Sequence, residues 1–162
     1  RDWGKEEWNA GLTANLLAPT ELIRATVDGM IERGFGRIVN VTSIAVRTPF
    51  PGLAMSSASR SALTALVASV SREVAAHNVT INNLQPGIFE TDRMHTGLRG
   101  AAEATGQSVE DTRAGMLSNI PAGRFGDPDE FGHACAFLCS SHSGFITGQN
   151  LLLDGGHFRG SF

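Results

Sequence analysis

Apolar side chains recur at helical spacing along the first thirty residues of the chain. They follow one another mostly at steps of three, four or seven, and they are Trp8, Leu12, Leu16, Ile23, Val27, Met30 and Ile31. This periodicity predicts one long helix over residues 5–33 with a single apolar face. Gly34 and Gly36 follow the last apolar position and are expected to end the helix.

Pro19 lies inside this predicted helix and is expected to kink it. Proline has no backbone N–H, so it cannot donate a hydrogen bond to the carbonyl of Asn15, four residues earlier. The carbonyl oxygen of Asn15 should therefore be free for another donor. An ordinary proline kink beside a polar Asn15 side chain explains the same residues without any function.

Short apolar runs further along the chain predict strands over residues 37–42, 78–84 and 149–153, and the last of these strands is expected to be buried. A helix over residues 53–77 should join the first two strands, and its expected buried face consists of Ala62, Leu63, Leu66, Val70 and Val74. A last helix has a strong start signal, because Asp127 can serve as N-cap, Pro128 fills the first helical position and Glu130 completes a capping box. Phe131, Ala134, Cys135 and Leu138 are expected to face inward from that helix.

Apolar strands that alternate with helices predict the α/β class, with a parallel sheet and helices on both faces. Right-handed crossovers would leave the three strands in sequential order. The chain has 162 residues, which suits one domain over residues 1–162. Between about residues 88 and 125 the pattern weakens, apart from a short helix expected over residues 108–117. This segment is expected to be a lid over a substrate, and a surface excursion without a role is the alternative.

Ser43 follows the first predicted strand, and a loop rich in proline and glycine separates it from the next helix. A hydroxyl at the carboxyl end of a strand, facing polar side chains of the following helix, is typical of an α/β active site. A strand–loop–helix connection with incidental serines is the plain alternative.

Composition narrows the possible functions. The net charge of −3 provides no basic surface for nucleic acid, and no apolar run approaches the length of a membrane span. The first residues do not have the pattern of a signal peptide. Cys135 and Cys139 are expected to be reduced thiols in a cytoplasmic protein. No metal site is expected, because no other Cys/His pair has suitable spacing.

Three separate motifs, in this order, resemble the C-terminal part of the short-chain dehydrogenase/reductase superfamily. They are the block from Val39 to Ser43, the run from Ser57 to Leu63 and the segment from Asn82 to Gly87. The chain is most similar to the 3-oxoacyl-acyl-carrier-protein reductases, from about residue 8 to residue 156. The resemblance implies strands five to seven of a Rossmann-type sheet. The family's first four strands and its glycine-rich phosphate turn have no counterpart in these 162 residues.

The resemblance also implies a set of site residues. Asn15, Ser43, Ser56 and Arg60 occupy the catalytic positions of the family, and Arg60, Pro86, Gly87, Ile88 and Thr91 occupy positions that bind the cofactor, which is NADP or NAD. In the family, the freed carbonyl at the position of Asn15 holds a water of the proton relay.

Two of these catalytic positions depart from the family. Its Tyr-x-x-x-Lys pair reads Ser56-x-x-x-Arg60 here, and the chain contains no tyrosine. A serine hydroxyl is far less acidic than a phenol, and an arginine with a pKa above about 12 does not shuttle protons. The expected consequence is impaired proton transfer with retained binding geometry.

The sequence therefore predicts an NAD(P)-dependent oxidoreductase that reduces a small-molecule carbonyl, such as a 3-oxoacyl thioester, or oxidises a secondary alcohol. The alternative is a catalytically inactive relative that works as a ligand-binding or oligomeric module. The resemblance implies a homodimer or homotetramer, and neither nucleic acid nor a membrane is expected as a partner.

Overall fold

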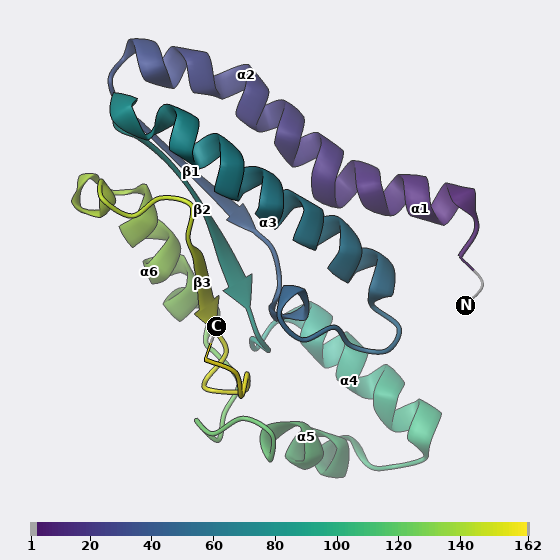
Figure 1. The fold of residues 1–162 in the computed structure, drawn as a ribbon. Helices are drawn as coiled ribbons and strands as arrows, with labels where there is room; N and C mark the ends of the chain where they lie inside the picture. The colour runs from purple at the N-terminus through teal and green to yellow at the C-terminus, as the bar shows by residue number, and fades with distance from the viewer. Residues whose placement is uncertain (1–2, 162) are drawn as a thin grey trace.

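The computed structural model describes residues 3–161 as a three-layer arrangement, with two long helical segments on one face of a small sheet and one helix on the other (Figure 1). The elements are α1 (Lys5–Leu12), the π-helical turn η1 (Thr13–Leu17), α2 (Ala18–Glu32), β1 (Gly36–Val41), the 3-10 turn η2 (Ile44–Val46), α3 (Ala54–Val74), the 3-10 turn η3 (Ala75–His77), β2 (Val79–Pro86), α4 (Asp92–Thr105), α5 (Val109–Leu117), α6 (Pro128–Cys139), the 3-10 turn η4 (Ser141–Ser143) and β3 (Asn150–Leu153).

The sheet confirms the predicted class and strand order. All pairs are parallel and the order is β1-β2-β3, with Ile38 opposite Ile81 and Leu84 opposite Leu151. The arrowheads of the strands point toward the end of the sheet where α4 and α5 lie (Figure 1). The carboxyl ends of β1, β2 and β3, with the loops that follow them, thus meet at one edge of the sheet. Ligands of α/β proteins bind at such an edge.

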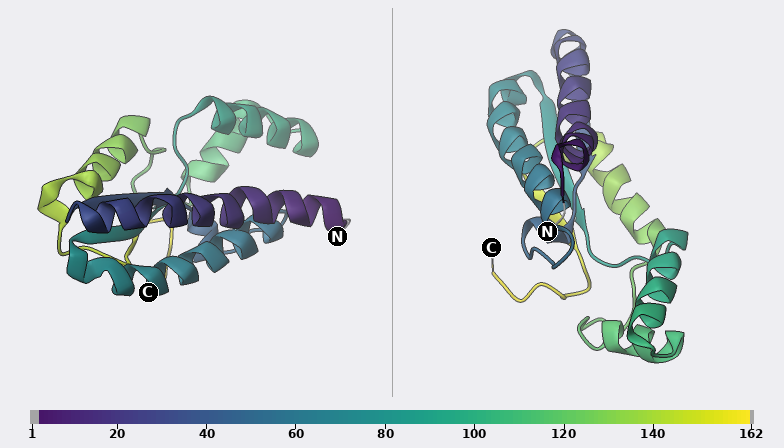
Figure 2. Two further views of the ribbon diagram at one scale, coloured as in Figure 1. Left: turned by 90° about the horizontal axis from the view of Figure 1, so that it is seen from above. Right: turned by 90° about the vertical axis from the view of Figure 1, so that its right-hand side faces the viewer.

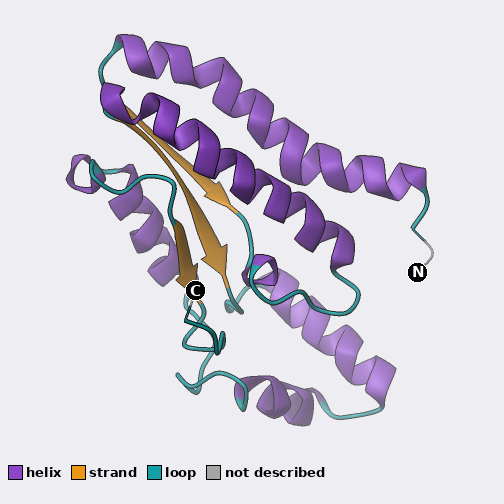
Figure 3. Ribbon diagram, in the orientation of Figure 1, coloured by secondary structure: helices purple, strands orange, loops and turns teal. Residues whose placement is uncertain are grey.

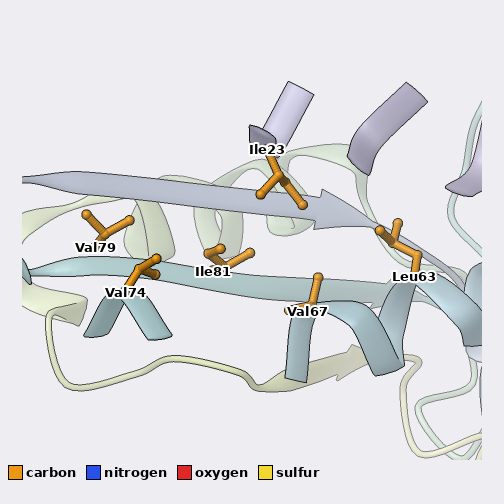
Figure 4. Packing of buried hydrophobic residues seen from close by; sticks show 6 residues of the cluster. All are labelled: Ile23, Leu63, Val67, Val74, Val79 and Ile81. Carbon is orange, nitrogen blue, oxygen red and sulfur yellow. The ribbon is translucent and has the colours of Figure 1, made fainter. Parts of the chain in front are cut away.

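The main core lies between α2, α3 and the sheet. Figure 4 shows six buried apolar side chains meeting there: Ile23, Leu63, Val67, Val74, Val79 and Ile81. One prediction about this core is wrong. Ala62 is exposed, whereas Val67, four residues after Leu63, is fully buried. The face of α3 that meets the sheet is therefore turned slightly from the predicted one, and two serines, Ser59 and Ser71, are also buried on it.

Helix α6 covers the opposite face of the sheet, so the predicted two-sided cover is confirmed (Figure 2). Arg37 of β1 reaches the end of this helix, where its Nε donates to the carbonyl of Ser140 at 3.1 Å. The predicted capping box is present, because Asp127 accepts from the backbone of the first turn and Glu130 accepts from the N–H of Asp127. Only Leu138 of the side chains expected to face inward is fully buried.

The N-terminal helical segment accommodates Pro19 by a local change of helix type. Thr13–Leu17 forms a π-helical turn, in which the N–H of Ala18 donates to the carbonyl of Thr13, five residues earlier. Pro19 then lies in the first turn of α2, where a missing N–H is tolerated. The single helix expected over residues 5–33 is therefore two α-helices joined by a π-turn.

The segment expected to be a lid contains more helix than its sequence suggested. Besides α5, which was expected, the structure has α4, whose first turn is capped by Thr91 (Figure 3). Small residues dilute the apolar pattern of α4, yet Leu98 and Ala102 are buried, four residues apart on one face. That sparse face was too short to give a clear periodic signal.

The third strand is not buried as expected, because Leu151 is 40% exposed and β3 pairs only with β2 among the described residues. Other large apolar side chains are also exposed near the sheet, including Val41, Phe137 and Phe145. These side chains leave apolar surface uncovered in the described part of the chain. Within residues 3–161, none of the helices combines the length and the hydrophobicity that crossing a bilayer requires.

Candidate functional site

Ser43 lies at the carboxyl end of β1, as expected. The strand is held to β2 up to this point, since the N–H of Thr42 donates to the carbonyl of Leu84 at 2.8 Å. The Oγ of Ser43 accepts from the N–H of Ala45 at 3.1 Å and caps η2. Because its oxygen acts as acceptor in this bond, the hydroxyl hydrogen of Ser43 remains available for a ligand.

Arg60 joins α3 to the end of β1, one residue before Ser43. Its Nη1 donates to the carbonyl of Val41 at 2.8 Å and to that of Thr42 at 3.0 Å. Its Nε donates to Oγ of Ser56 at 3.2 Å, one turn earlier on α3. We call these three bonds the Arg60 clamp. The clamp brings Ser56 and Arg60 to the strand end that carries Ser43.

The guanidinium of Arg60 lies in a partly buried and electropositive environment. Burial, and in second place the charge of Arg93 at the start of α4, lower the pKa of Arg60 from its ordinary value. Arg60 stays a cation, because arginine is not deprotonated in proteins. Among residues 3–161, Nη2 of Arg60 has no hydrogen-bond partner, so two of its N–H groups remain available to a ligand.

Asn15 lies in η1, the turn that packs on α3. Its Nδ2 donates to the carbonyl of Gly11 at 3.0 Å. In the described part of the chain, no side-chain hydrogen bond joins Asn15 to Ser43, Ser56 or Arg60. The structure therefore places Ser56 and Arg60 beside the strand end that carries Ser43. The catalytic roles of Ser43, Ser56 and Arg60 and the relay role of Asn15 stay predictions.

Pro86 is the last residue of β2, and Gly87 continues the chain beside the end of β3 without a turn. The N–H of Gly87 donates to the carbonyl of Leu153 at 2.8 Å. A Cβ at position 87 would lie 2.8 Å from Cα of Asp154, so only glycine allows this backbone approach. Ile88 follows, and its carbonyl accepts from the N–H of Gly126 at 2.9 Å.

Thr91, the last of the expected cofactor-binding residues, caps α4. Its Oγ1 accepts from the N–H of Met94 at 3.2 Å, so its hydroxyl hydrogen is still available to a ligand. The position of these residues at the carboxyl edge of the sheet is as expected. Their role in cofactor binding stays a prediction.

An ion pair joins α5 to Glu90, which lies between β2 and α4. Both terminal nitrogens of the Arg113 guanidinium donate to the carboxylate of Glu90, at 2.8 and 3.1 Å. The guanidinium also lies over the ring of Phe125, 4.6 Å from its centroid. Nε2 of His95 lies 3.5 Å from the same carboxylate. The hydrogen bond from Arg113 is the main cause that lowers the pKa of Glu90. We call Glu90 and Arg113 the lid pair.

Sequence reasoning missed Arg47, which lies in the loop after Ser43. Its Nε donates to Oε1 of the buried Gln85 at 2.8 Å, and its Nη2 donates to the carbonyl of Asn150 at 3.1 Å. Arg47 thereby ties this loop to β2 and β3. The signal was present in the sequence, because a glutamine within an apolar strand needs a polar partner when buried.

Two cavities lie at this edge of the sheet. One, of about 400 Å³, lies between the residues that follow β2, the end of β3 and the start of α6. The other, of about 430 Å³, lies beside the loop after Ser43 and the C-terminal residues. Within residues 3–161 no cluster of three or more His, Cys, Asp or Glu side chains could hold a metal ion. Cys135 and Cys139 are both free thiols.

Comparison with known proteins decides the family. A family model described as enoyl-(acyl carrier protein) reductase matches residues 1–157. The chain belongs to the short-chain dehydrogenase/reductase family. It is similar to the 3-oxoacyl-acyl-carrier-protein reductase FabG of Vibrio harveyi, with 35% identity over 153 residues, 94% of this chain and 58% of that protein. It is also similar to the acetoacetyl-CoA reductase of Allochromatium vinosum, with 35% identity over 151 residues, 93% of this chain and 57% of that protein.

Solved structures of this family have the same fold. The NADPH-dependent reductase YwfH, involved in bacilysin biosynthesis, matches with a TM-score of 0.92 and 28% identity, over 98% of this chain and 61% of that one. A gluconate dehydrogenase (a putative one) from Agrobacterium tumefaciens matches with a TM-score of 0.85 and 26% identity, over 96% and 58% of the two chains. The chain thus spans less than two thirds of the length of these short-chain dehydrogenases.

Proposed function

We propose that this chain forms the substrate-binding and catalytic part of an NAD(P)-dependent oxidoreductase. The reaction is the reduction of a carbonyl compound, with a 3-oxoacyl thioester as the first candidate, or the oxidation of a secondary alcohol. The observation that carries the proposal is the Arg60 clamp, which holds Ser56 and Arg60 at the strand end that carries Ser43. The names of the similar reductases support the same reaction class.

The residues at the carboxyl edge fit a nicotinamide cofactor. Arg60 has two free N–H donors on Nη2, and the Thr91 hydroxyl retains its hydrogen, so both can donate to the oxygen atoms of a ribose, a carboxamide or a phosphate. Pro86, Gly87 and Ile88, at the carboxyl end of β2, would hold the nicotinamide end of the cofactor. When bound, the nicotinamide supplies or accepts the hydride.

The protein's own groups would orient and polarise the substrate. The free hydroxyl hydrogen of Ser43 would donate to the carbonyl oxygen of the substrate, which stabilises the negative charge that develops there. Ser56 accepts from Nε of Arg60, so its own hydrogen can point toward the same oxygen. The carbonyl of Asn15 would hold a water that resupplies the proton.

Proton transfer is the weak step of this arrangement. Arg60 binds but does not exchange its proton, and Ser56 is a much weaker acid than the tyrosine of the family. Removal of a positioned general acid costs roughly 10²- to 10⁴-fold in rate. We therefore expect slow turnover rather than none.

The test is turnover by the full-length protein, from the start of its coding sequence. Oxidation of NADPH or NADH is followed with acetoacetyl-CoA and a panel of simple ketones, and the reverse reaction with the matching alcohols. We expect slow turnover that drops at least tenfold in Ser43→Ala and is unchanged in Ser61→Ala, an exposed serine on α3. Equal rates for wild type and Ser43→Ala would contradict the proposal.

One observation favours a second candidate, a catalytically inactive ligand-binding module. Nη1 of Arg60 is already bonded to the carbonyls of Val41 and Thr42, which makes Arg60 a structural link between α3 and β1. The double substitution Ser56→Tyr with Arg60→Lys distinguishes the slow enzyme from the inactive binding module. A rise in turnover of at least tenfold favours the slow enzyme, whereas NADPH binding without turnover in both proteins favours the inactive module.

We also propose a homodimer or homotetramer in the cytoplasm. The exposed apolar side chains near β3, Phe137, Phe145 and Leu151, support burial against another subunit. The two free thiols support a reducing compartment.

A further inference from the structure

The cavity beside the loop after Ser43 begins one residue beyond that serine. It has a volume of about 430 Å³ and is lined by Ile44, Thr48, Phe50, Asn119, His157, Phe158, Arg159 and Gly160. These residues come from three parts of the chain: the loop after β1, the connection after α5 and the C-terminal residues. A space of this size, in the loop next to Ser43, is suited to a small molecule.

The C-terminal wall of the cavity is held in place by defined contacts. The carboxylate of Asp154 accepts from the N–H of Gly156 at 2.9 Å and from that of Phe158 at 2.7 Å. The guanidinium of Arg47 lies over the ring of Phe158 at 5.5 Å, and the rings of Phe50 and His157 are 6.3 Å apart. Residues 157 and 158 are therefore packed against the loop that follows Ser43.

The lining combines aromatic surface with donors for an anion. Arg159 contributes a guanidinium, and Asn119 and Thr48 contribute neutral polar groups. None of the residues that line the cavity in the described chain carries a carboxylate. Nδ1 of His157 is buried and has no hydrogen-bond partner among residues 3–161. The cavity thus offers one cation and neutral donors to an anion, with no carboxylate among its described lining residues to oppose binding.

The neighbouring cavity of about 400 Å³ lacks these properties. Its cation, Arg124, is bonded through both terminal nitrogens to Glu130, which also lines that space. The positive charge of Arg124 is thus already matched within the protein. Arg159 is exposed and forms no ion pair among residues 3–161, so its charge is available to a ligand.

We propose that the cavity beside Ser43 binds the carboxylate-bearing end of an oxo-acid, and that Arg159 selects this carboxylate. A single guanidinium matches a planar, singly charged carboxylate with two parallel hydrogen bonds. Phe50 and Phe158 would contact the apolar middle of the ligand, and its oxo group would lie toward Ser43. This inference rests on the proposed function for the reaction, and it narrows the carbonyl substrate to one chemical class.

Binding tests the inference without any need for turnover. The full-length protein, at saturating NADP, is titrated by calorimetry with 4-oxo-4-phenylbutanoate and with its uncharged methyl ester. Because the guanidinium would make two charge-assisted hydrogen bonds to the carboxylate, the acid should bind at least about tenfold more tightly than the ester. Arg159→Gln should reduce this preference to about twofold or less, and Arg159→Lys should give an intermediate value because lysine lacks the fork.

The matched control is Arg72→Gln, because Arg72 is an exposed arginine in the last turn of α3. This variant should keep the full preference for the acid over the ester. Equal affinity for acid and ester overturns the inference, and so does a preference that survives Arg159→Gln. Turnover separates this inference from the proposed function. Arg159-dependent binding of the acid without reduction of any carbonyl contradicts only the function, whereas reduction of acid and ester with equal kcat/KM contradicts only the inference.

Discussion

The Arg60 clamp should contribute measurably to stability, and Arg60→Met removes all three of its bonds. The carbonyl of Thr42 is partly buried, so loss of its donor costs about 1–3 kcal/mol. The carbonyl of Val41 is exposed and can accept from water instead, which limits that loss to about 0–1 kcal/mol. The bond to Ser56 adds about 0.5–1.5 kcal/mol. We expect a total loss of about 2–4 kcal/mol, since such losses are not strictly additive.

Urea unfolding followed by circular dichroism measures this change. With a slope of about 2 kcal/mol per molar urea, the midpoint should fall by about 1–2 M at an unchanged slope. Arg72→Met is the matched control, because Arg72 donates only to a carbonyl of its own helix, that of Ala68, at an exposed position. Its midpoint should move by no more than about 0.3 M. If the Arg60 and Arg72 variants unfold at the same urea concentration, the clamp is not a stabilising link.

Three further outcomes follow from the packing and the ion pairs. The pKa of Glu90 in the folded protein is lowered mainly by its hydrogen bond with Arg113. The lid pair should therefore stabilise α5 fully at pH values above the glutamate pKa of the unfolded chain, about 4.3. This stabilisation should be lost as the pH falls through the lower pKa that Glu90 has in the folded protein. The protection factors of the α5 amides, which are corrected for the intrinsic exchange rate at each pH, should therefore fall below pH 4, and Glu90→Gln should lower them already at pH 7. The pKa of Glu130 is lowered to about 2, mainly by Arg124, and an NMR titration of Arg124→Gln should find it closer to its ordinary 4.5. Ile81→Ala should lower the free energy of unfolding by about 2–5 kcal/mol, because Ile81 is fully buried in the core.

The strands and the start of α6 could be predicted because their signals are local. The short apolar runs of β1 and β2 need no knowledge of distant residues, and both strands fall within a residue or two of the expected range. The capping box at Asp127 depends on residues no more than three apart. Local hydrogen-bonding rules therefore placed this helix correctly.

The misses have tertiary causes. Val67 rather than Ala62 meets the sheet, because the rotation of α3 is set by its packing against α2 and β2. Leu151 is exposed because β3 has one neighbour in the described chain, which no pattern within β3 itself reveals. Helix α4 is stabilised by the burial of only Leu98 and Ala102 and by a threonine cap, a signal too weak to separate from a loop.

For the candidate site, residue types could be predicted but their partners could not. The motifs identified Ser43, Ser56 and Arg60, and the strand-end position of Ser43 followed from the apolar run before it. That Arg60 would donate to two main-chain carbonyls depends on the approach of α3 to β1 in space. The same holds for Arg47, whose partners on β2 and β3 lie 38 and 103 residues away along the chain.

The clamp suggests that the two departures from the family are coupled. An arginine at position 60 reaches the main chain of β1 through Nη1, and its Nε at the same time holds Ser56, four residues earlier. A tyrosine at position 56 offers no oxygen at the distance of a serine Oγ, so it would compete with this geometry rather than extend it. A lysine at position 60 has one nitrogen and no fork, and it could not serve both the strand and residue 56. Ser56→Tyr alone should therefore disturb the clamp and add little activity, whereas the double exchange relieves the conflict. Additive effects of the two substitutions on turnover would show that Ser56 and Arg60 act independently.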